Sequence, residues 1–214
     1  MTDEILQMNY ILQVVVLLFS VIVHEVAHGY VAYRRGDNTA KMLGRLTLNP
    51  VPHIDLFGSI VLPLMLLLFN APVFGWAKPV PINPLKLNNP KKDMIWVSLA
   101  GCAANFALAV IAGIGMFLIK NFVTTEASVF VSVYYILNIM LIINVILPLF
   151  NLIPVPPLDG SRVVFLLLPK EAAAKYAKIE PYGFIIIFAL LATGILWKII
   201  APIAYFLINI LGGR

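Results

Sequence analysis

Residues 8–33 read MNYILQVVVLLFSVIVHEVAHGYVAY, an almost unbroken apolar run with two histidines and a glutamate near its end. Burying imidazoles and a carboxylate in hydrocarbon is costly, so ionisable side chains at membrane depth mark a functional site. The pattern His24-Glu25-x-x-His28 sets the histidines four residues apart, where one face of a helix can present both to one metal ion. Glu25 lies beside that face without being a ligand. The stretch therefore predicts a membrane helix with a metal site of the zinc-hydrolase type.

A purely structural explanation of these three residues has to be weighed against metal binding. A single histidine in an apolar helix is usually a packed core residue. In a soluble protein the same three residues could lie on a solvated helix face at little cost in free energy. Here the structural explanation would leave three polar groups uncompensated in the membrane, so we favour metal binding.

The composition is that of a polytopic membrane protein. Of 214 residues, 61% are hydrophobic and 12% are charged, and the mean hydropathy is +0.96. We expect an all-α membrane protein, a helical bundle formed by a single domain over residues 1–214. Since about 20 residues are needed to cross the hydrocarbon, the first, third and fourth of its apolar segments are clear spans. The segments are residues 8–34, 55–70, 94–119, 128–150, 182–200 and 203–212.

The first apolar segment is expected to stay in the protein as a helix. Asp3 and Glu4 precede it where a cleavable signal peptide would carry basic residues, and the segment itself contains the histidine motif. The net charge of +5 does not indicate a nucleic-acid partner, because the basic residues are spread over loops without a basic stripe or interleaved aromatics. The single cysteine, Cys102, lies in an apolar segment and is expected to be a small packing residue.

A catalytic zinc needs a third protein ligand beyond the two histidines, with water in the fourth position. Asp159 is the leading candidate because it closes a proline-broken stretch that extends the fourth apolar segment from Asn151 to Gly160. Irregular backbone at membrane depth is tolerated only where it is buried in protein or lines a wet cavity. His53 and Asp55 form a close pair in a loop and are the alternative source of the ligand, although a structural role is expected for both.

Three motifs together resemble the site-2 proteases, a family of intramembrane zinc metalloproteases. They are His24-Glu25-x-x-His28, a central-helix G-x-x-x-N at Gly101 and Asn105, and the proline-rich turn from Asn151 that ends in Asp159-Gly160. At Cys102 the relatives commonly carry proline. The stretch 44–84 resembles a compact subgroup that lacks PDZ and CBS domains.

The resemblance implies a role for each matching residue. His24, His28 and Asp159 would bind one Zn²⁺ per chain, Glu25 would be the general base, and Asn151 would hold the substrate carbonyl. The implied reaction is hydrolysis of a peptide bond within or next to a transmembrane helix of a membrane-protein substrate in the lipid bilayer, known as regulated intramembrane proteolysis.

The site closes only with one topology. His28 lies near the end of the first span, so Asp159 must return to the same side, and the region 46–92 must therefore start and finish on that side. We expect it to form a re-entrant excursion that returns through an extended, β-like segment at 73–84. This topology defines a three-span catalytic core over 8–34, 94–119 and 128–150.

The distribution of basic residues supports the same topology. In this topology nearly all of the basic residues fall on one side of the membrane, and Lys120 is the clear exception. The positive-inside rule makes that side cytoplasmic. The basic residues on that side are Arg34, Arg35, Lys41, Arg45, Lys78, Lys86, Lys91, Lys92, Arg162, Lys170, Lys175 and Lys178. We expect a multi-pass protein of a prokaryotic plasma membrane with its active site toward the cytoplasm.

Other readings of the remaining features stay open. Asn105 is expected to join helices through side-chain hydrogen bonds, with Gly101 allowing their close approach. Residues 182–212 are expected to form gate helices. A catalytically silent protein that binds transmembrane helices is the first alternative function. A divalent-metal transporter is the second, although it should show repeated halves and a polar pathway. Glu25 discriminates, because neither alternative needs a non-ligating acid there.

Overall fold

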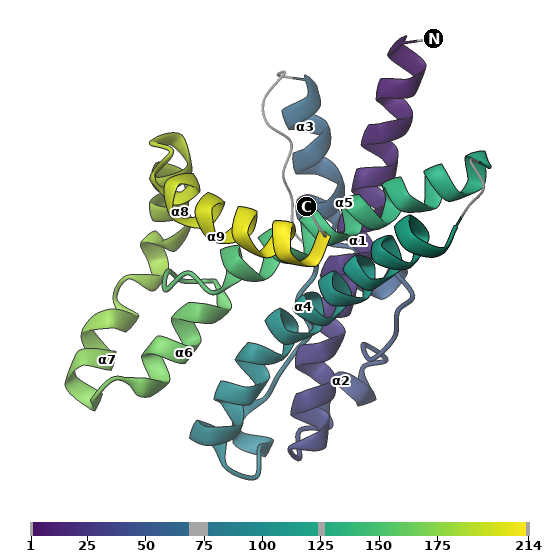
Figure 1. The fold of residues 1–214 in the computed structure, drawn as a ribbon. Helices are drawn as coiled ribbons and strands as arrows, with labels where there is room; N and C mark the ends of the chain where they lie inside the picture. The colour runs from purple at the N-terminus through teal and green to yellow at the C-terminus, as the bar shows by residue number, and fades with distance from the viewer. Residues whose placement is uncertain (1, 69–76, 124–126, 213–214) are drawn as a thin grey trace.

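The computed structural model describes residues 2–68, 77–123 and 127–212, and the described chain is helical without a strand (Figure 1). Its long helices are α1 (Thr2–Arg34), α4 (Pro90–Phe122), α5 (Ser128–Asn151) and α9 (Ile195–Gly212). The shorter helices are α2 (Thr39–Met42), α3 (Leu62–Leu68), α6 (Asp159–Leu167), α7 (Lys170–Ala177) and α8 (Gly183–Ala192). Single turns occur at η1 (Val51–His53), η2 (Leu56–Val61), η3 (Pro84–Lys86) and η4 (Glu180–Tyr182).

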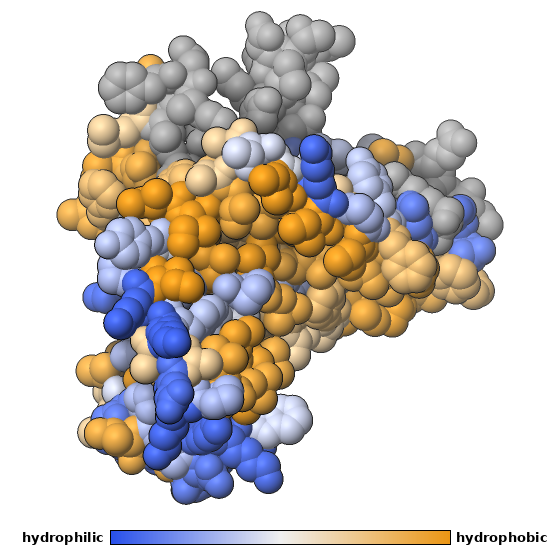
Figure 2. Space-filling view, turned by 90° about the vertical axis from the view of Figure 1, so that its left-hand side faces the viewer, coloured by the Kyte–Doolittle hydropathy of each residue, from blue (hydrophilic) through white to orange (hydrophobic). Residues whose placement is uncertain are grey.

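Four of the described helices are long and apolar enough to cross a membrane: α1 from Ile11 onward, α4, α5 and α9. Many of their large apolar side chains are exposed on the protein surface and few are fully buried, as expected where lipid rather than water surrounds a bundle. The protein is therefore a multi-pass, all-α membrane protein. A hydrophobic band covers the middle of the molecule, and hydrophilic side chains gather at its lower end (Figure 2).

Helix α4 is the centre of the bundle and packs against α1 on one side and α5 on the other. Small residues along α4 allow this close approach, among them Gly101, Ala109 and Ala112, which are buried. The main apolar core joins α4 to α5 and α9 through Met116, Leu141, Val145, Leu196 and Ile200.

The connection between α1 and α4 starts and finishes at the same end of the molecule. The Asn88 backbone N–H donates to the Arg35 carbonyl at 2.8 Å, and the Arg35 guanidinium pairs with Asp93 at 3.0 Å. Between these points α3 contains only seven residues, too few to cross a bilayer. The chain thus leaves α1, rises through η2 and α3, and returns to enter α4 beside its starting point (Figure 1).

The returning segment is extended but pairs with no strand within the described part of the chain. Residues 73–76 lie outside the described residues, and residues 77–83 have no regular structure. Pro79 and Pro81 have no N–H to donate, and the N–H groups of Val80 and Asn83 bind side-chain carboxylates. No β-ladder therefore runs through residues 77–83, the described part of this segment.

Helices α8 and α9 are separated at Gly194, although the gap between the apolar segments 182–200 and 203–212 lies at Pro202. Gly194 adopts φ +69°, a left-handed conformation that glycine takes readily, and it ends α8 before α9 begins. Pro202 lies inside α9, which continues to Gly212. A proline removes one backbone hydrogen bond, and packing against neighbouring helices lets a membrane helix continue through it.

Candidate metal centre

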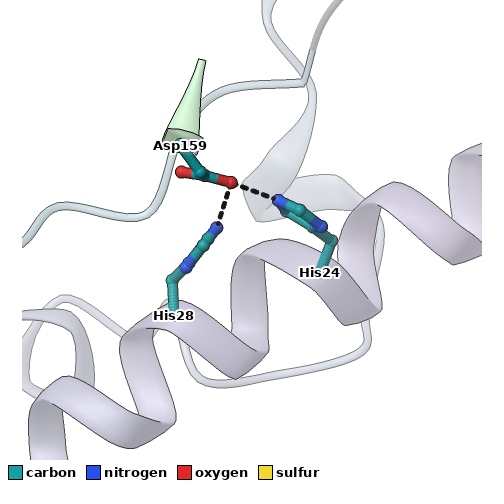
Figure 3. A group of neighbouring side chains, drawn as sticks. All are labelled: His24, His28 and Asp159. Carbon is teal, nitrogen blue, oxygen red and sulfur yellow. Dashed lines mark hydrogen bonds and ion pairs between the residues drawn. The ribbon is translucent and has the colours of Figure 1, made fainter. Parts of the chain in front are cut away.

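His24, His28 and Asp159 meet in one buried group between α1 and α6 (Figure 3). The two histidines lie one turn apart on the same face of α1, and Asp159 is the first residue of α6. Asp159 Oδ2 lies 3.0 Å from His24 Nε2 and 3.2 Å from His28 Nε2. All three residues are less than 9% exposed, so the structure brings together the three residues expected to bind metal.

A tight turn after α5 delivers Asp159 to this position. Helix α5 ends at Asn151, and the chain then folds back through Pro154 and a cis bond between Pro156 and Pro157. Gly160 packs so closely that a Cβ there would collide with the Leu152 carbonyl. The Asp-Gly pair is thus required on both counts: the aspartate for its carboxylate and the glycine for the close approach.

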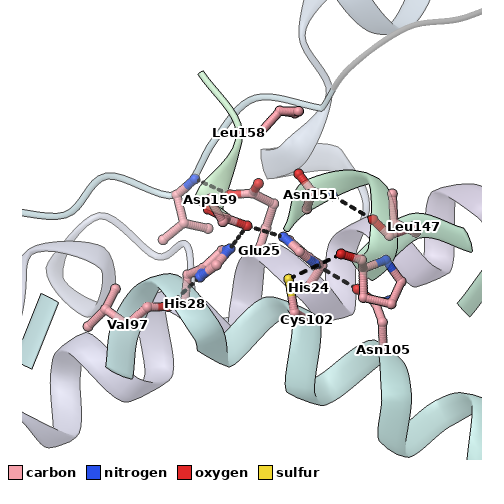
Figure 4. A network of polar contacts seen from close by, with 12 residues as sticks. His24, Glu25, His28, Val97, Cys102, Asn105, Leu147, Asn151, Leu158 and Asp159 are labelled. Atoms are coloured by element: carbon pink, nitrogen blue, oxygen red, sulfur yellow. Dashed lines mark hydrogen bonds and ion pairs between the residues drawn. The ribbon is translucent and has the colours of Figure 1, made fainter. Parts of the chain in front are cut away.

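The second nitrogen of each imidazole is held by an acceptor (Figure 4). His24 Nδ1 lies 2.6 Å from Asn105 Oδ1, and His28 Nδ1 lies 2.6 Å from the Val97 carbonyl. A carbonyl can only accept, so each Nδ1 carries the proton and each Nε2 presents a lone pair when the ring is neutral.

This arrangement fits a divalent metal. The lone pair of each imidazole faces Asp159 Oδ2 at about 3 Å, which is repulsive for neutral rings unless a cation lies among them. Zinc binds two histidine nitrogens and a carboxylate in this manner, and the far nitrogen of each such histidine usually donates to a carbonyl or carboxylate oxygen.

Asn105 belongs to a polar network that joins the three core helices. Its Nδ2 donates to Asn144 Oδ1 at 2.7 Å and to the Ser20 carbonyl at 3.1 Å, while Asn144 Nδ2 donates to Ser20 Oγ at 2.8 Å. All three side chains are fully buried. Because both donors of Asn105 are used, its Oδ1 is fixed as the acceptor for His24. Asn105 thus joins the helices through hydrogen bonds, as expected from the sequence, and it also orients the His24 ring.

Gly101 has a more specific role than helix packing. A Cβ at this position would lie 2.5 Å from His24 Nε2, so only glycine leaves room for the imidazole against α4. Ser20 and Asn144 were not among the expected site residues. The signal available in the sequence was that both are polar residues within apolar spans.

Glu25 lies beside the metal centre and accepts a hydrogen bond from the Val80 backbone N–H at 2.7 Å. Prolines flank Val80 on both sides, so this N–H is the single backbone donor over residues 79–81. Gly29 faces the same segment, since a Cβ there would lie 2.7 Å from a Val80 methyl carbon. The extended segment thus packs against α1 and holds the Glu25 carboxylate through its backbone.

Side chains from the α1–α3 region anchor this extended segment. Arg45 is buried and donates to the Lys78 and Pro79 carbonyls at 2.7 and 3.3 Å. Asp37, also buried, accepts from the Asn83 N–H at 2.6 Å and from the Thr39 N–H at 3.0 Å. Burial would raise the pKa of Asp37, but the hydrogen bond from the Thr39 hydroxyl, together with those from the Asn83 and Thr39 N–H groups, holds that pKa below its usual value.

His53 and Asp55 are the alternative source of a third ligand, and in the structure both make hydrogen bonds that hold their own loop. His53 Nε2 lies 2.9 Å from the Thr47 carbonyl, and the His53 carbonyl accepts from the Lys78 N–H. Asp55 caps η2 by accepting from the Gly58 N–H at 2.7 Å. Neither lies in the group formed by His24, His28 and Asp159.

Asn151 and Cys102 lie on the α5 side of the centre (Figure 4). Asn151 is half-buried at the end of α5, where its Nδ2 donates to the Leu147 carbonyl at 3.0 Å. Cys102 is buried, with Sγ 3.8 Å from the Pro148 carbonyl.

The fold and the site define a class: membrane proteins with an internal His-His-carboxylate metal site beside a glutamate. The model of Peptidase family M50 matches residues 113–194. The Bacillus subtilis protein named "Putative zinc metalloprotease YwhC" is 40% identical over 188 residues, which cover 84% of this chain and 80% of that protein. A Mycolicibacterium smegmatis protein, "Putative zinc metalloprotease Rip2", is 30% identical over 95% of this chain and 75% of its own length.

A more distant relative is the Methanocaldococcus jannaschii protein "Zinc metalloprotease MJ0392", 25% identical over 73% of this chain and 34% of its own length. No solved structure matches the chain. The chain belongs to Peptidase family M50, the site-2 protease family, and it is a zinc-dependent metalloprotease.

Proposed function

We propose that this protein hydrolyses a peptide bond within or next to a transmembrane helix of a membrane-protein substrate, in regulated intramembrane proteolysis. The observation that carries the proposal is the meeting of His24, His28 and Asp159 between membrane-spanning helices. A substrate that reaches this group must itself enter the bundle from the bilayer. The basic residues at one end of the molecule support a prokaryotic plasma membrane, with the site toward the cytoplasm.

In this proposal His24, His28 and Asp159 hold one zinc ion per chain. Zinc, when bound, supplies the Lewis-acid chemistry of a metallohydrolase, lowering the pKa of a water molecule and polarising a carbonyl. The Asn105 side chain and the Val97 carbonyl keep the Nε2 atoms of the histidines directed at Asp159, so the ligand geometry is set before substrate arrives.

Glu25 is the proposed general base. It accepts the proton of the attacking water and passes it to the leaving amine, which restores its own charge. The Val80 N–H fixes one carboxylate oxygen and leaves the other available for the proton. Asn151 is the proposed donor to the substrate carbonyl, for which its amide would have to leave the Leu147 carbonyl.

A helical substrate must unwind before it can be cleaved, because its carbonyls are occupied in internal hydrogen bonds. Exposed backbone groups cost several kcal/mol each in hydrocarbon unless the enzyme supplies partners. The extended segment at 77–83 is one such partner and could align an unwound strand by backbone pairing. Since Pro79 and Pro81 offer only carbonyl acceptors, the substrate would have to supply the N–H donors there.

The test is cleavage of a reporter transmembrane segment by the purified protein in detergent, with and without a central Gly-Pro pair. The wild type should cleave both reporters, the Gly-Pro form faster, and Glu25→Gln should cleave neither. Asn151→Ala should cleave both more slowly while keeping its zinc. Equal rates for both reporters and both active enzymes would contradict the unwinding requirement and the role of Asn151.

A further inference from the structure

A groove of about 590 Å³ opens at the hydrophilic end of the molecule, between α4 and the α6–α7 pair. Its volume is in the range of sites that enclose ligands. Most of its lining is apolar and comes from Pro84, Pro90, Met94, Pro157, Phe165 and Leu166. The groove can therefore accept a large apolar side chain.

The elements that wall the groove also build the metal centre. Met94 lies one turn along α4 from Val97, whose carbonyl holds His28. Ser161 lies two residues after Asp159 on α6. Pro84 directly follows the extended segment that binds Glu25. A chain that leaves the metal centre toward the hydrophilic end would thus be led between these walls.

The charged lining of the groove is predominantly basic. Lys91 at the start of α4 and Arg162 in the first turn of α6 are both exposed there, and Glu180 is the acid in the lining. Lys92 follows Lys91 directly and is also exposed. An acidic chain is attracted to such a groove, and a basic chain is repelled.

We propose that this groove binds the flank of the substrate's transmembrane segment and selects a flank with an apolar side chain beside acidic residues. The inference rests on the proposed function, since it concerns how that substrate is chosen. Most membrane proteins carry Lys or Arg on the cytoplasmic flank of a span. A basic groove on the same side disfavours these abundant segments, so charge separates substrates from the other proteins of the membrane.

The test uses three single-span reporters that differ only in the flank, which reads Phe-Glu-Glu, Phe-Gln-Gln or Phe-Lys-Lys. Each is cleaved by the wild type, by the double variant Lys91→Glu/Arg162→Glu, and by Lys120→Glu, a control at the far end of α4. For the wild type, kcat/KM should be highest for the Phe-Glu-Glu reporter, intermediate for Phe-Gln-Gln and lowest for Phe-Lys-Lys. Since two exposed charge pairs are involved, kcat/KM should differ between the reporters by roughly two- to thirtyfold.

The double variant should reverse this order, and the control should keep it. Retained zinc in the double variant shows that it has folded. An unchanged order in the double variant, or equal kcat/KM for all reporters in the wild type, would overturn the proposal.

Failure of the proposed function would appear differently, as no cleavage of any reporter by the wild type. In that case, the affinity of the Glu25→Gln variant for each of the three reporters tests the groove. The affinity should be highest for the Phe-Glu-Glu flank, intermediate for Phe-Gln-Gln and lowest for Phe-Lys-Lys. Equal binding would overturn the groove as a selective site.

Discussion

The two histidines of the metal centre are oriented by different kinds of group. His28 is held by the Val97 backbone carbonyl, which no substitution removes, whereas His24 is held by the Asn105 side chain. We predict that Asn105→Ala lowers zinc affinity by about 10- to 100-fold, because His24 loses the acceptor that fixes its ring. Zinc titration of the apo protein measures this. Asn121→Ala on the same helix, where the wild-type side chain donates to the Phe117 carbonyl, is the matched control and should bind zinc normally.

A second prediction concerns the Val80 backbone N–H, which donates a hydrogen bond to the Glu25 carboxylate. Val80→Pro removes the N–H that holds the carboxylate, whereas Val80→Ala retains it. Hydrogen bonds to charged groups contribute about 1.5–3 kcal/mol, so Val80→Pro should lower kcat roughly tenfold or more with zinc still bound. Val80→Ala should stay near the wild type. Equal losses in both variants would mean that the valine side chain, not its N–H, matters.

The residues that meet at the candidate metal centre could be predicted from the sequence, whereas the contacts that orient them could not. His24 and His28 are related by helix periodicity, and Asp159 by a proline-broken turn, so all three are visible in the chain. The contact between Asn105 and His24 depends on how α4 is rotated against α1, which no local pattern determines. The same is true of the Val80 N–H, which reaches Glu25 across 55 residues of sequence.

At the scale of elements, the spans are predictable and the breaks between them less so. Long apolar runs mark α1, α4 and α5 because hydrocarbon requires about 20 residues to cross. Pro202 suggests a break where α9 continues, since proline in a membrane helix costs one hydrogen bond that packing can offset. The strand-like return segment keeps its extended form but, lacking N–H groups at Pro79 and Pro81, forms no ladder among the described residues.

Asp37 connects two of these elements, because it binds the start of α2 and the end of the extended segment. Asp37→Asn replaces one of the two accepting carboxylate oxygens with an NH2 group that cannot accept, so the free energy of unfolding near pH 7 should fall by about 2 kcal/mol. The pKa of Asp37 is depressed in the folded protein. Its stabilisation is therefore complete above the ordinary value of 3.8 and is lost as pH falls through the lower folded pKa.

Thermal unfolding of the wild type and of Asp37→Asn in detergent, from pH 7 down to pH 3, measures this contribution. The difference in stability between the two proteins should be constant at neutral pH and shrink at the acidic end. A difference that grows with acidity would contradict the assignment.

At the scale of the whole molecule, α1 must end and α4 must begin on one side of the membrane. The contact between Asn88 and Arg35 places them together in the structure. We predict that Lys41→Cys, Lys91→Cys and Lys175→Cys, each in a Cys102→Ala background, are labelled from the cytoplasmic face. Lys120→Cys should be labelled from the opposite face. Labelling of position 91 from outside with position 41 inside would make the α3 region an ordinary span.

We propose that His24, His28 and Asp159 hold one zinc ion while Glu25 acts on the proton alone. The most direct measurement is zinc content together with reporter cleavage in Asp159→Ala and Glu25→Gln, each purified in detergent. We predict about one zinc per chain in the wild type and in Glu25→Gln, which should not cleave, and strongly reduced zinc in Asp159→Ala. Full zinc in Asp159→Ala, with its loss in His53→Ala, would contradict the claim.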